Sequence, residues 1–287
     1  MNLKNDYLDN GKPVHRKSYC AFLDVLGFSD RIKENAKSVA NANALLQTFH
    51  DILTTQLKSL EEETTWSKLY LKSFTDNVIL AHPQFSHDLE SEFGFIIDSL
   101  ISFQLQMVLN GFFIRGGLTV GELYMDANVV FGQALIDAHD LESKVADTPT
   151  VVLSNDVMSL VNSHLDYYSS KAHAPQNRHV LVNSDGRYFI NYLSGSILGS
   201  YDREEVHWHS LEQHKERIEE NLQKYKIFPK VFAKYAWSAA YHNYFCELVC
   251  DYSGYDPKVK ISSKNTQISF SRIANSEIAM PHNDVVI

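Results

Sequence analysis

The stretch Phe22–Phe28 has the sequence FLDVLGF and places a single aspartate, Asp24, inside an apolar run. We expect residues 19–26 to form a buried strand, because this run follows a polar leader of residues 1–18. A carboxylate in such a strand is costly unless it is paired or bound to a metal ion. Asp24 therefore either binds a metal, pairs with a core lysine or arginine, or lies at the end of the strand.

The residues after this strand predict a tight turn into a helix. Gly27 ends the strand, and Ser29 is expected to cap a helix that begins at Asp30. Backbone N–H groups at a turn of this kind can bind the oxygens of a phosphate group. The turn from Val25 to Phe28 is therefore a candidate phosphate-binding segment.

A second aspartate, Asp76, lies in a predicted β-hairpin. Residues 66–74 alternate as a strand and residues 78–81 form its return partner, with the turn at Thr75-Asp76-Asn77 between them. Taken alone, Asp76 is best explained as a turn residue that makes local hydrogen bonds.

Strand alternation in this hairpin places Tyr70, Lys72, Phe74 and Asp76 on one face. Two aspartates on neighbouring central strands favour a metal site over a simple turn residue. Hard cations such as Mg²⁺ are typically held by one or two carboxylates together with substrate phosphates. Asp24 and Asp76 are therefore candidate ligands of divalent metal ions.

A third segment, residues 114–122, combines an arginine with a pair of glycines. Glycines inside a strand usually mark the close approach of a ligand or of another backbone, and Gly116 and Gly117 are both inside this strand. Arg115 beside them is a natural contact for phosphate. The alternative is a β-bulge with a surface arginine, and this segment alone does not decide between the two.

The remaining patterns complete an α/β (α+β) sandwich with a largely antiparallel sheet, of the ferredoxin-like type. The predicted order is β-α-α-β-β-α-β-β-α-β. The further helices are expected at residues 39–60, 87–110 and 132–145, and the further strands at residues 112–120, 121–124, 129–130 and 150–153.

Three parts are expected along the chain: the leader 1–18, a catalytic core 19–162, and a helical C-terminal elaboration 163–287 packed on that core. No linker in the C-terminal part demands a separate domain. Its predicted elements are a loop with a short helix at 163–184, strands at 187–193 and 267–271, helices at 210–226 and 230–250, and Asn155 is expected to cap the helix that follows the last strand of the core.

Composition narrows the function. The chain has 287 residues, 44% of them hydrophobic, and a formal net charge of −9. An acidic chain is a poor partner for a nucleic-acid polymer, whose binding draws on clustered lysine and arginine, but metal ions can mediate contact with a small anionic substrate.

The most apolar stretch, residues 94–114, is interrupted by polar residues and is expected to be a buried helix running into a strand, not a membrane span. Three cysteines and a leader without an apolar run favour the reducing cytoplasm.

Three motifs in this order resemble those of the class III nucleotidyl cyclases. They are Phe-x-Asp-x-x-Gly-Phe at 22–28, Lys-x-x-x-Asp at 72–76 and Arg-x-Gly-x-x-x-Gly at 115–121, followed by Phe131-Gly132 and by the helix end Leu141-Glu142-Ser143. The resemblance covers roughly residues 19–155. It is the order and spacing of the motifs, and no single one of them, that is specific.

The resemblance implies a catalytic homodimer with its active sites between the two subunits. It implies that Asp24 and Asp76, with Val25 beside them, bind two Mg²⁺ or Mn²⁺ ions per site. The turn that contains Gly27 and Phe28 would hold the phosphates of a nucleoside triphosphate. Lys72 would then lie near the base.

Two features depart from the usual cyclase pattern. Cyclases usually carry an asparagine and, four residues later, an arginine on the helix after Phe131-Gly132, and here these positions are Ile136 and Asp140. The usual glycine before the second metal aspartate is Thr75. Because that arginine stabilises the charge that develops on the transferred phosphoryl group, an ordinary adenylate cyclase is not expected.

The residues that fill these motifs look most like those of the pyrimidine cyclases of bacterial Pycsar anti-phage systems. These enzymes make cyclic UMP or cyclic CMP from UTP or CTP, and the messenger activates a separate effector. In this interpretation Tyr70 narrows the base pocket against purines, and Arg115 supplies the missing catalytic cation. The alternatives are an adenylate or guanylate cyclase, and a catalytically silent cyclase-like nucleotide sensor.

Overall fold

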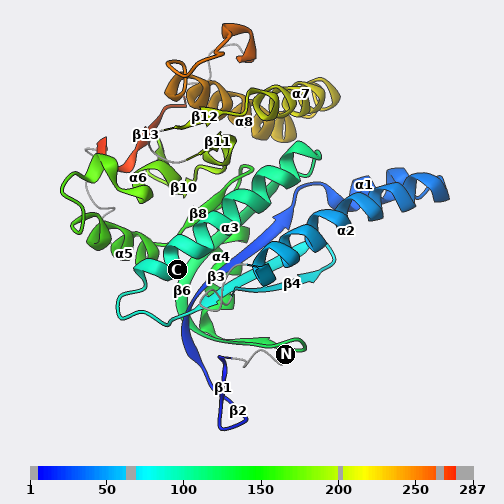
Figure 1. Ribbon diagram of the computed structural model, residues 1–287. Coiled ribbons are helices and arrows are strands. Elements are labelled where there is room, and N and C mark those ends of the chain that lie inside the picture. The colour runs from blue at the N-terminus through cyan, green and yellow to red at the C-terminus, as the bar shows by residue number, and fades with distance from the viewer. Residues whose placement is uncertain (1–5, 63–68, 200–202, 263–267, 276–287) are drawn as a thin grey trace. The chain divides into compact units, whose positions relative to one another are not determined.

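The computed structural model describes residues 6–62, 69–199, 203–262 and 268–275 (Figure 1). The chain forms two compact units, Met1–Leu160 and Val161–Ile287, and each is described by itself. The boundary lies two residues before the predicted end of the core at residue 162. The expected packing of the C-terminal segment on the core stays a prediction.

The N-terminal unit is built on a mixed sheet with the order β8-β6-β3-β5-β4, in which β3 is central. All its strand pairs are antiparallel except β6 with β8, and β7 pairs with the far end of β6. The strands are β3 (Arg16–Val25), β4 (Tyr70–Phe74), β5 (Asn77–Pro83), β6 (Ile114–Met125), β7 (Val130–Phe131) and β8 (Val151–Leu153).

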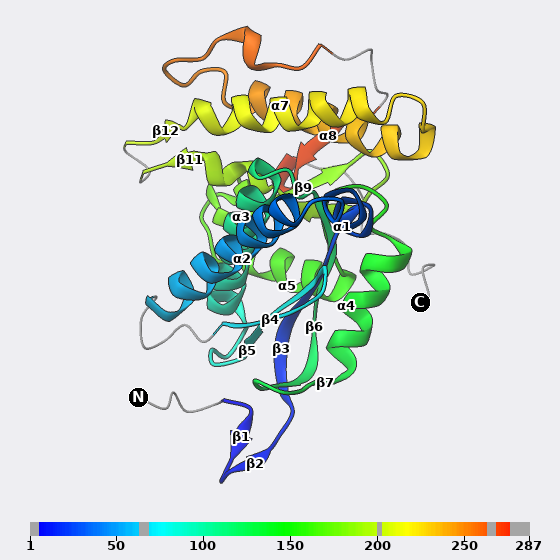
Figure 2. The same cartoon turned by 90° about the vertical axis from the view of Figure 1, so that its right-hand side faces the viewer.

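Helices cover both faces of this sheet, with α2 and α3 on one side and α4 on the other (Figure 2). Alternation along β3 explains the arrangement. The ring of Tyr19 packs against Phe93 of α3, whereas the ring of Phe22 packs against His139 of α4. The helices are α1 (Phe28–Asn35), α2 (Val39–Glu62), α3 (Glu90–Leu109) and α4 (Gln133–Lys144).

From β3 to β8 the order of elements is the predicted one, so the mixed α/β fold with a mostly antiparallel sheet is confirmed. The expected break in the strand at Gly121 is wrong, because β6 runs without interruption through it. A Cβ on Gly121 would touch Ala134 at 3.4 Å, so this glycine admits α4 and does not end the strand.

The predicted helix starts need two corrections. Ser29 does not cap α1, which begins at Phe28 with Gly27 in the N-cap position and no side-chain cap. Asn155 is the first residue of α5 (Asn155–Leu165), and the cap is the hydroxyl of Ser154, which accepts a hydrogen bond from the N–H of Val157 at 3.2 Å.

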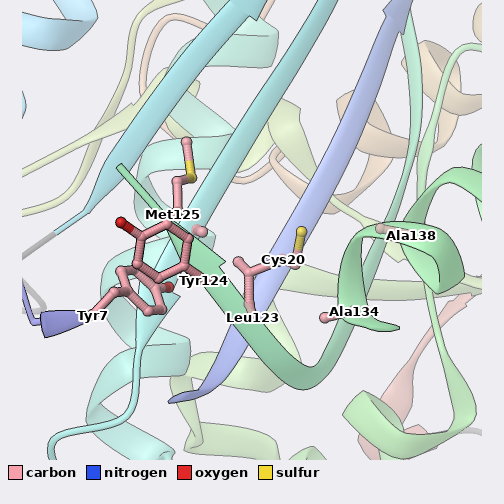
Figure 3. Close-up of a cluster of buried hydrophobic side chains, with 8 residues drawn as sticks. Tyr7, Cys20, Leu123, Tyr124, Met125, Ala134 and Ala138 are labelled. Atoms are coloured by element: carbon pink, nitrogen blue, oxygen red, sulfur yellow. The ribbon is translucent and has the colours of Figure 1, made fainter. Parts of the chain in front are cut away.

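Residues 6–18 of the polar leader take part in the fold. They contain a small hairpin of β1 (Leu8–Asp9) and β2 (Lys12–Pro13). Tyr7 is fully buried in a cluster with Cys20 of β3, Tyr124 of β6 and residues of α4 (Figure 3). The Tyr7 hydroxyl is 2.9 Å from the hydroxyl of Ser18. The hydrophobic pattern did not predict the burial of Tyr7, because its neighbours in the sequence are polar.

Helix α3 is long and apolar enough to cross a membrane by length and composition, and among the described residues it alone meets that test. Of its most apolar window, 67% is buried inside the protein. The predicted buried helix that runs into a strand is therefore confirmed, with α3 leading into β6.

The C-terminal unit combines a small antiparallel sheet with two long helices. β9 pairs with both β10 and β13, and β11 pairs with β12. Residues 66–68 and 267 of the predicted strands lie outside the described residues. The elements are η1 (Lys171–His173), α6 (Pro175–His179), β9 (Val180–Asn183), β10 (Tyr188–Ile190), η2 (Tyr192–Ser196), β11 (Ile197–Leu198), β12 (Glu205–Val206), α7 (Trp208–Lys224), α8 (Pro229–Leu248), η3 (Pro257–Val259), β13 (Phe270–Arg272) and η4 (Ile273–Asn275).

A chain of buried polar side chains joins α7 and α8 in this unit. The Nδ1 atoms of His214 and His242 are 2.9 Å apart, and Tyr192 Oη is 2.8 Å from His214 Nε2. His242 Nε2 is 3.0 Å from the carbonyl oxygen of Val259, so it is the donor of that bond. His242 Nδ1 is then an acceptor, which makes His214 Nδ1 a donor and leaves His214 Nε2 to accept from Tyr192. Both histidines are therefore held neutral.

Candidate metal and nucleotide site

Asp24 lies near the C-terminal end of β3, between two partner strands. It is paired in register with Asn77 of β5 on one side and with Arg115 of β6 on the other. Directly opposed residues of antiparallel strands point to the same face of the sheet. Since Phe22, two residues earlier, packs against α4, the side chains of Asp24 and Arg115 lie on the α4 face.

Arg115 contacts two carboxylates and a carbonyl group. Its Nε lies 3.1 Å from Asp24 Oδ2, and its Nη2 lies 2.7 Å from Oε1 of Glu142 on α4. The contact with Glu142 is a close charge contact without the alignment of a good hydrogen bond. Nη1 donates to the carbonyl oxygen of Ala146 at 3.4 Å. The side chains of Arg115, Asp24 and Glu142 are 26%, 20% and 5% exposed.

These contacts decide between the alternatives for two residues. Asp24 pairs with a core arginine, as one of its three interpretations expected. Arg115 lies in an unbroken ladder from Arg16 to Val25, so the predicted bulge with a surface arginine is wrong. The pairing of Asp24 does not exclude metal binding, because a carboxylate has two oxygens and accepts several partners.

Two neighbouring glycines of β6 allow close approaches, Gly117 to α4 and Gly116 to β3. A Cβ on Gly117 would lie 2.6 Å from the carbonyl oxygen of Ala138 and 3.2 Å from the backbone nitrogen of Glu142. A Cβ on Gly116 would lie 2.6 Å from the carbonyl oxygen of Phe22. Only glycine permits both approaches, and the result is a helix that presents Glu142 directly to the guanidinium group.

Asp76 sits in a two-residue turn, Thr75-Asp76, between β4 and β5. Its carbonyl oxygen accepts from the N–H of Val25 at 3.2 Å, so the turn lies against the end of β3. Its Oδ1 accepts from the Thr75 hydroxyl at 2.8 Å, which is the local hydrogen bond expected of a turn aspartate. Thr75 has φ of 56°, a conformation that β-branched residues rarely adopt and that the usual glycine would adopt freely.

The turn after β3 leads from Asp24 into α1. The N–H of Leu26 donates to the carbonyl oxygen of Phe113 at 2.8 Å, and Gly27 has φ of 69°. Nothing lies within 4 Å of a Cβ on Gly27, so its conformation and not lack of space requires glycine. The first N–H groups of a helix have no partner within that helix, and no side chain caps α1.

Phe28 anchors this turn. Its ring lies 5.1 Å from Phe49 of α2 and 6.3 Å from Phe112, which precedes β6. The guanidinium of Arg31 covers the Phe112 ring at 4.1 Å and donates to the carbonyl oxygen of Gly111 at 2.6 Å. The side chain of Phe28 is thus structural, and only its backbone N–H remains suited to a phosphate contact.

Phe74 of β4 lies opposite Asn77 of β5, which lies opposite Asp24 of β3, so these three side chains share one face of the sheet. Lys72 and Tyr70 point to the same face, because they alternate with Phe74 along β4. Lys72 contributes to the lowered pKa of Asp126, after the larger effects of hydrogen bonds from the Tyr124 hydroxyl and the Val129 and Asn128 N–H groups. The predicted shared face of Tyr70, Lys72 and Phe74 is confirmed, whereas Asp76 belongs to the turn.

Tyr70 is held by the leader. Its hydroxyl accepts from the N–H of Asp6 at 3.0 Å, and its ring meets Tyr7 edge-on at 5.1 Å. Burial raises the pKa of Tyr70 to about 12, so it stays a neutral phenol. A hollow of about 460 Å³ is lined by Pro13, Val14, His15, Tyr124, Asp126, Val129 and Phe131.

The oxygen donors at the end of β3 fit a hard divalent cation. Asp24 and Asp76 supply carboxylates from neighbouring strand ends, and Val25, whose N–H donates to the Asp76 carbonyl oxygen, would add its own carbonyl oxygen. Within the described residues no group of three or more histidine, cysteine, aspartate or glutamate side chains could hold a metal. Mg²⁺ is commonly bound by only one or two carboxylates plus substrate phosphates, so this pair fits the ion when a triphosphate completes the site.

Sequence reasoning missed the role of Glu142, although it belongs to the quoted helix end. The available signal was spacing, since Glu142 falls on the same helical face as the buried Ala134 and Ala138. The two positions of α4 that depart from the cyclase pattern do not belong to its buried face. Ile136 is 55% exposed, and Asp140 pairs with Lys144 at 2.8 Å.

Comparisons with known proteins leave the family open. No protein-family model and no curated protein matches this chain. Among solved structures it is similar to a class III adenylyl cyclase-like ATP-binding protein from Pseudomonas aeruginosa, with 10% identity over 51% of this chain and 35% of that chain and a TM-score of 0.40. It is also similar to a bacterial light-regulated adenylyl cyclase, with 14% identity over 63% of this chain and 53% of that chain and a TM-score of 0.42.

This chain therefore spans about a third of the first of these proteins and about half of the second. At these identities and TM-scores neither likeness carries an argument about activity. The case for a function rests on the residues of this chain.

Proposed function

We propose that this protein is a pyrimidine nucleotide cyclase that converts UTP or CTP into the 3′,5′-cyclic monophosphate and pyrophosphate. The observation that carries the proposal is the meeting of two carboxylate-bearing strand ends beside a glycine turn. The Val25 N–H bonds to the Asp76 carbonyl oxygen at 3.2 Å, Asp24 precedes Val25, and Gly27 opens α1 two residues later. Metal ligands and phosphate donors are thus adjacent.

In the proposed reaction the 3′-oxygen of the ribose bonds to the α-phosphorus. The bond from the α-phosphorus to the oxygen of the β-phosphate breaks, pyrophosphate leaves, and the hydroxyl proton passes to solvent. Two Mg²⁺ or Mn²⁺ ions, when bound, lower the pKa of the 3′-hydroxyl and neutralise the triphosphate. Asp24, Asp76 and Val25 would hold them.

Other residues bind and orient the substrate. The N–H groups at Gly27 and Phe28 suit the phosphate oxygens, because they open a helix. Arg115 places a cation beside Asp24, where negative charge develops on the phosphoryl group during transfer. Lys72 would contact the base, and the Tyr70 ring, held by Tyr7, would be a fixed wall against the larger purines.

The setting of the proposed activity follows from the sequence resemblance. The enzyme would be a cytoplasmic homodimer with its active sites at the subunit interface. Its cyclic nucleotide would activate a separate effector during phage infection. Neither a membrane nor a nucleic-acid polymer takes part.

A second candidate is a catalytically silent domain that binds a nucleotide as a sensor. The observation that favours it is on α4, where Ile136 is exposed and Asp140 is paired with Lys144. Neither residue supplies the amide or guanidinium that cyclases usually place there. An adenylate or guanylate cyclase with unusual catalytic residues remains within the same chemistry.

A turnover assay separates these functions. Purified protein with Mn²⁺ or Mg²⁺ is incubated with ATP, GTP, CTP or UTP separately, and the products are resolved by chromatography. Cyclic UMP or cyclic CMP supports the proposal and identifies the base, whereas cyclic AMP or cyclic GMP overturns the pyrimidine assignment. Nucleotide binding without release of pyrophosphate indicates the sensor.

The metal role of Asp76 has its own test. Asp76→Ala removes a proposed ligand from a two-residue turn, so the fold should survive and turnover should fall to background, at least about a hundredfold. The matched control is Asp185→Ala, which removes an exposed turn aspartate of the C-terminal unit and should retain full activity. A folded Asp76→Ala protein with normal turnover would disprove the mechanism.

A further inference from the structure

Glu142 is the most buried charged group near Asp24, with a side chain only 5% exposed. A carboxylate at this depth is strongly unfavourable unless a cation stays beside it. Arg115 is that cation, with Nη2 at 2.7 Å. The same guanidinium uses Nε for Asp24 at 3.1 Å, so one positive charge is shared by two carboxylates.

The two carboxylates differ in what else they can bind. Asp24 lies at the strand end beside Asp76 and the Gly27 turn, where a divalent cation has access. Glu142 belongs to the buried face of α4 and is in contact with Arg115. If a metal binds Asp24, the repulsion between the two cations weakens the contact of Arg115 with Asp24. The contact of Arg115 with the buried carboxylate of Glu142 is retained.

We propose that Glu142 is a positioning residue that tethers Arg115, and that Arg115 occupies Asp24 as an internal cation until a divalent metal competes for that carboxylate. This inference rests on the proposed metal role of Asp24. In this order of events, metal binding to Asp24 comes first and releases the Nε side of Arg115 from that carboxylate. The tethered guanidinium then faces the substrate phosphates.

The arrangement predicts opposite effects of substitutions on metal affinity. Glu142→Gln leaves Asp24 as the single carboxylate partner of Arg115 within this trio, so Arg115 competes harder and Mn²⁺ binding weakens, roughly three- to tenfold. The double variant Arg115→Gln/Glu142→Gln removes the competing cation and leaves no buried unpaired charge. Its Mn²⁺ affinity should rise by a similar factor while turnover is lost.

The experiment is calorimetric titration of Mn²⁺ into the nucleotide-free, full-length protein and its variants. The control is Glu204→Gln, which breaks an ion pair with Arg178 in the C-terminal unit whose side chains are 27% and 16% exposed, a burial similar to that of the Arg115–Asp24 pair. Glu204→Gln should leave Mn²⁺ affinity unchanged. Thermal melts of each variant confirm that the protein is folded.

The outcomes separate this inference from the proposed function. Opposite shifts in the two Glu142 variants support the tether even if no nucleotide is cyclised. Cyclase activity with the same Mn²⁺ affinity in all variants keeps the function and overturns the tether. A wild-type protein that binds no Mn²⁺ in the absence of nucleotide overturns the tether, and the turnover assay then decides the proposed function by itself.

Discussion

The charge on Asp24 is balanced within the protein before any ligand binds. Its carboxylate is 20% exposed and contacts Arg115, which in turn contacts the more deeply buried Glu142. Ion pairs with this much exposure contribute little to stability, about 0–1 kcal/mol. The carboxylate of Asp24 is therefore expected to serve binding more than folding, and the two effects can be measured separately.

Asp24→Asn tests that separation. The amide keeps the shape and can still meet the guanidinium, and Glu142 retains its partner, so the free energy of unfolding should change by no more than about 1 kcal/mol. Mn²⁺ binding and turnover should both be lost. Chemical denaturation and metal titration give the two values. A large loss of stability with unchanged Mn²⁺ affinity would show that Asp24 is a structural residue only.

Single residues were only partly predictable from the sequence. Asp24 stood out as a carboxylate inside an apolar strand, and Asp76 became a candidate because its turn belongs to a predicted neighbouring strand. The partner of Asp24 is 91 positions away in Arg115, and only the register of β3 with β6 brings them together. Glu142 looked like one more charged residue on a helix, since its burial depends on how closely α4 approaches the sheet.

At the scale of elements, the backbones of β6 and α4 approach each other more closely than a residue with a Cβ atom at position 117 would allow. Gly117 lies under the carbonyl oxygen of Ala138, and this approach sets the height of Glu142 above Arg115. Sequence patterns predicted both elements but not their spacing. They also predicted a break at Gly121, because a glycine in a strand gives the same signal whether it ends the strand or admits a helix.

Two glycine substitutions should have opposite effects. Gly117→Ala places a methyl group 2.6 Å from the Ala138 carbonyl oxygen and should cost about 1–3 kcal/mol of unfolding free energy. Gly94→Ala is the matched control, because Gly94 lies inside α3 with nothing within 4 Å of an added Cβ. It should gain about 0.5–1 kcal/mol. Equal effects in urea denaturation would contradict the close packing of α4.

The paired histidines of α7 and α8 predict how the C-terminal unit responds to acid. Burial lowers the pKa of His242 to about 4 and that of His214 well below its ordinary value, and each cation would also face a charged neighbour, Lys215 beside His242 and His242 beside His214. In the unfolded chain both titrate near 6.5. Between these values the unfolded state binds more protons, so stability is full above about pH 6.5 and falls as the pH is lowered toward 4.

The expected loss is about 2 kcal/mol per histidine between pH 7.5 and pH 5. Tryptophan fluorescence follows this unit, since Trp208 and Trp237 both belong to it. His242→Gln keeps an amide donor for the Val259 carbonyl oxygen but does not titrate. It should be less stable at pH 7.5 and should show a pH slope smaller by about one proton. An unchanged slope would mean that the pair is protonated in the folded state.

At the scale of the whole molecule, the net charge of −9 opposes the approach of a nucleoside triphosphate. Recognition must then depend on a few local cations, and bound divalent metals are the strongest of these. The proposed site follows this logic, because its carboxylates repel a bare triphosphate and bind one that arrives with metal ions. The separate C-terminal unit, Val161–Ile287, supplies none of the residues assigned to the site.

The proposed dimer has a testable surface in the N-terminal unit. Two large apolar side chains are exposed on its α4 side, Phe74 at 74% and Ile136 at 55%. Single exposed apolar residues are ordinary, but several on one face are typical of an interface. Phe74 belongs to this face by its register opposite Asn77, and Ile136 lies on α4 itself.

Ile136→Lys should weaken the dimer and lower turnover at equal protein concentration, because a charge in the centre of an apolar interface must be desolvated. The fold should be unaffected within about 0.5 kcal/mol, since the position is exposed and Asp140 is one helical turn away. Leu46→Lys is the control. Leu46 is 64% exposed on α2, on the other side of the sheet, and this change should leave both mass and turnover unaltered. Sedimentation equilibrium measures the mass of the assembly. A dimer that is equally stable in both variants would mean that the interface lies elsewhere. The exposed apolar side chains on the α4 side would then need another explanation.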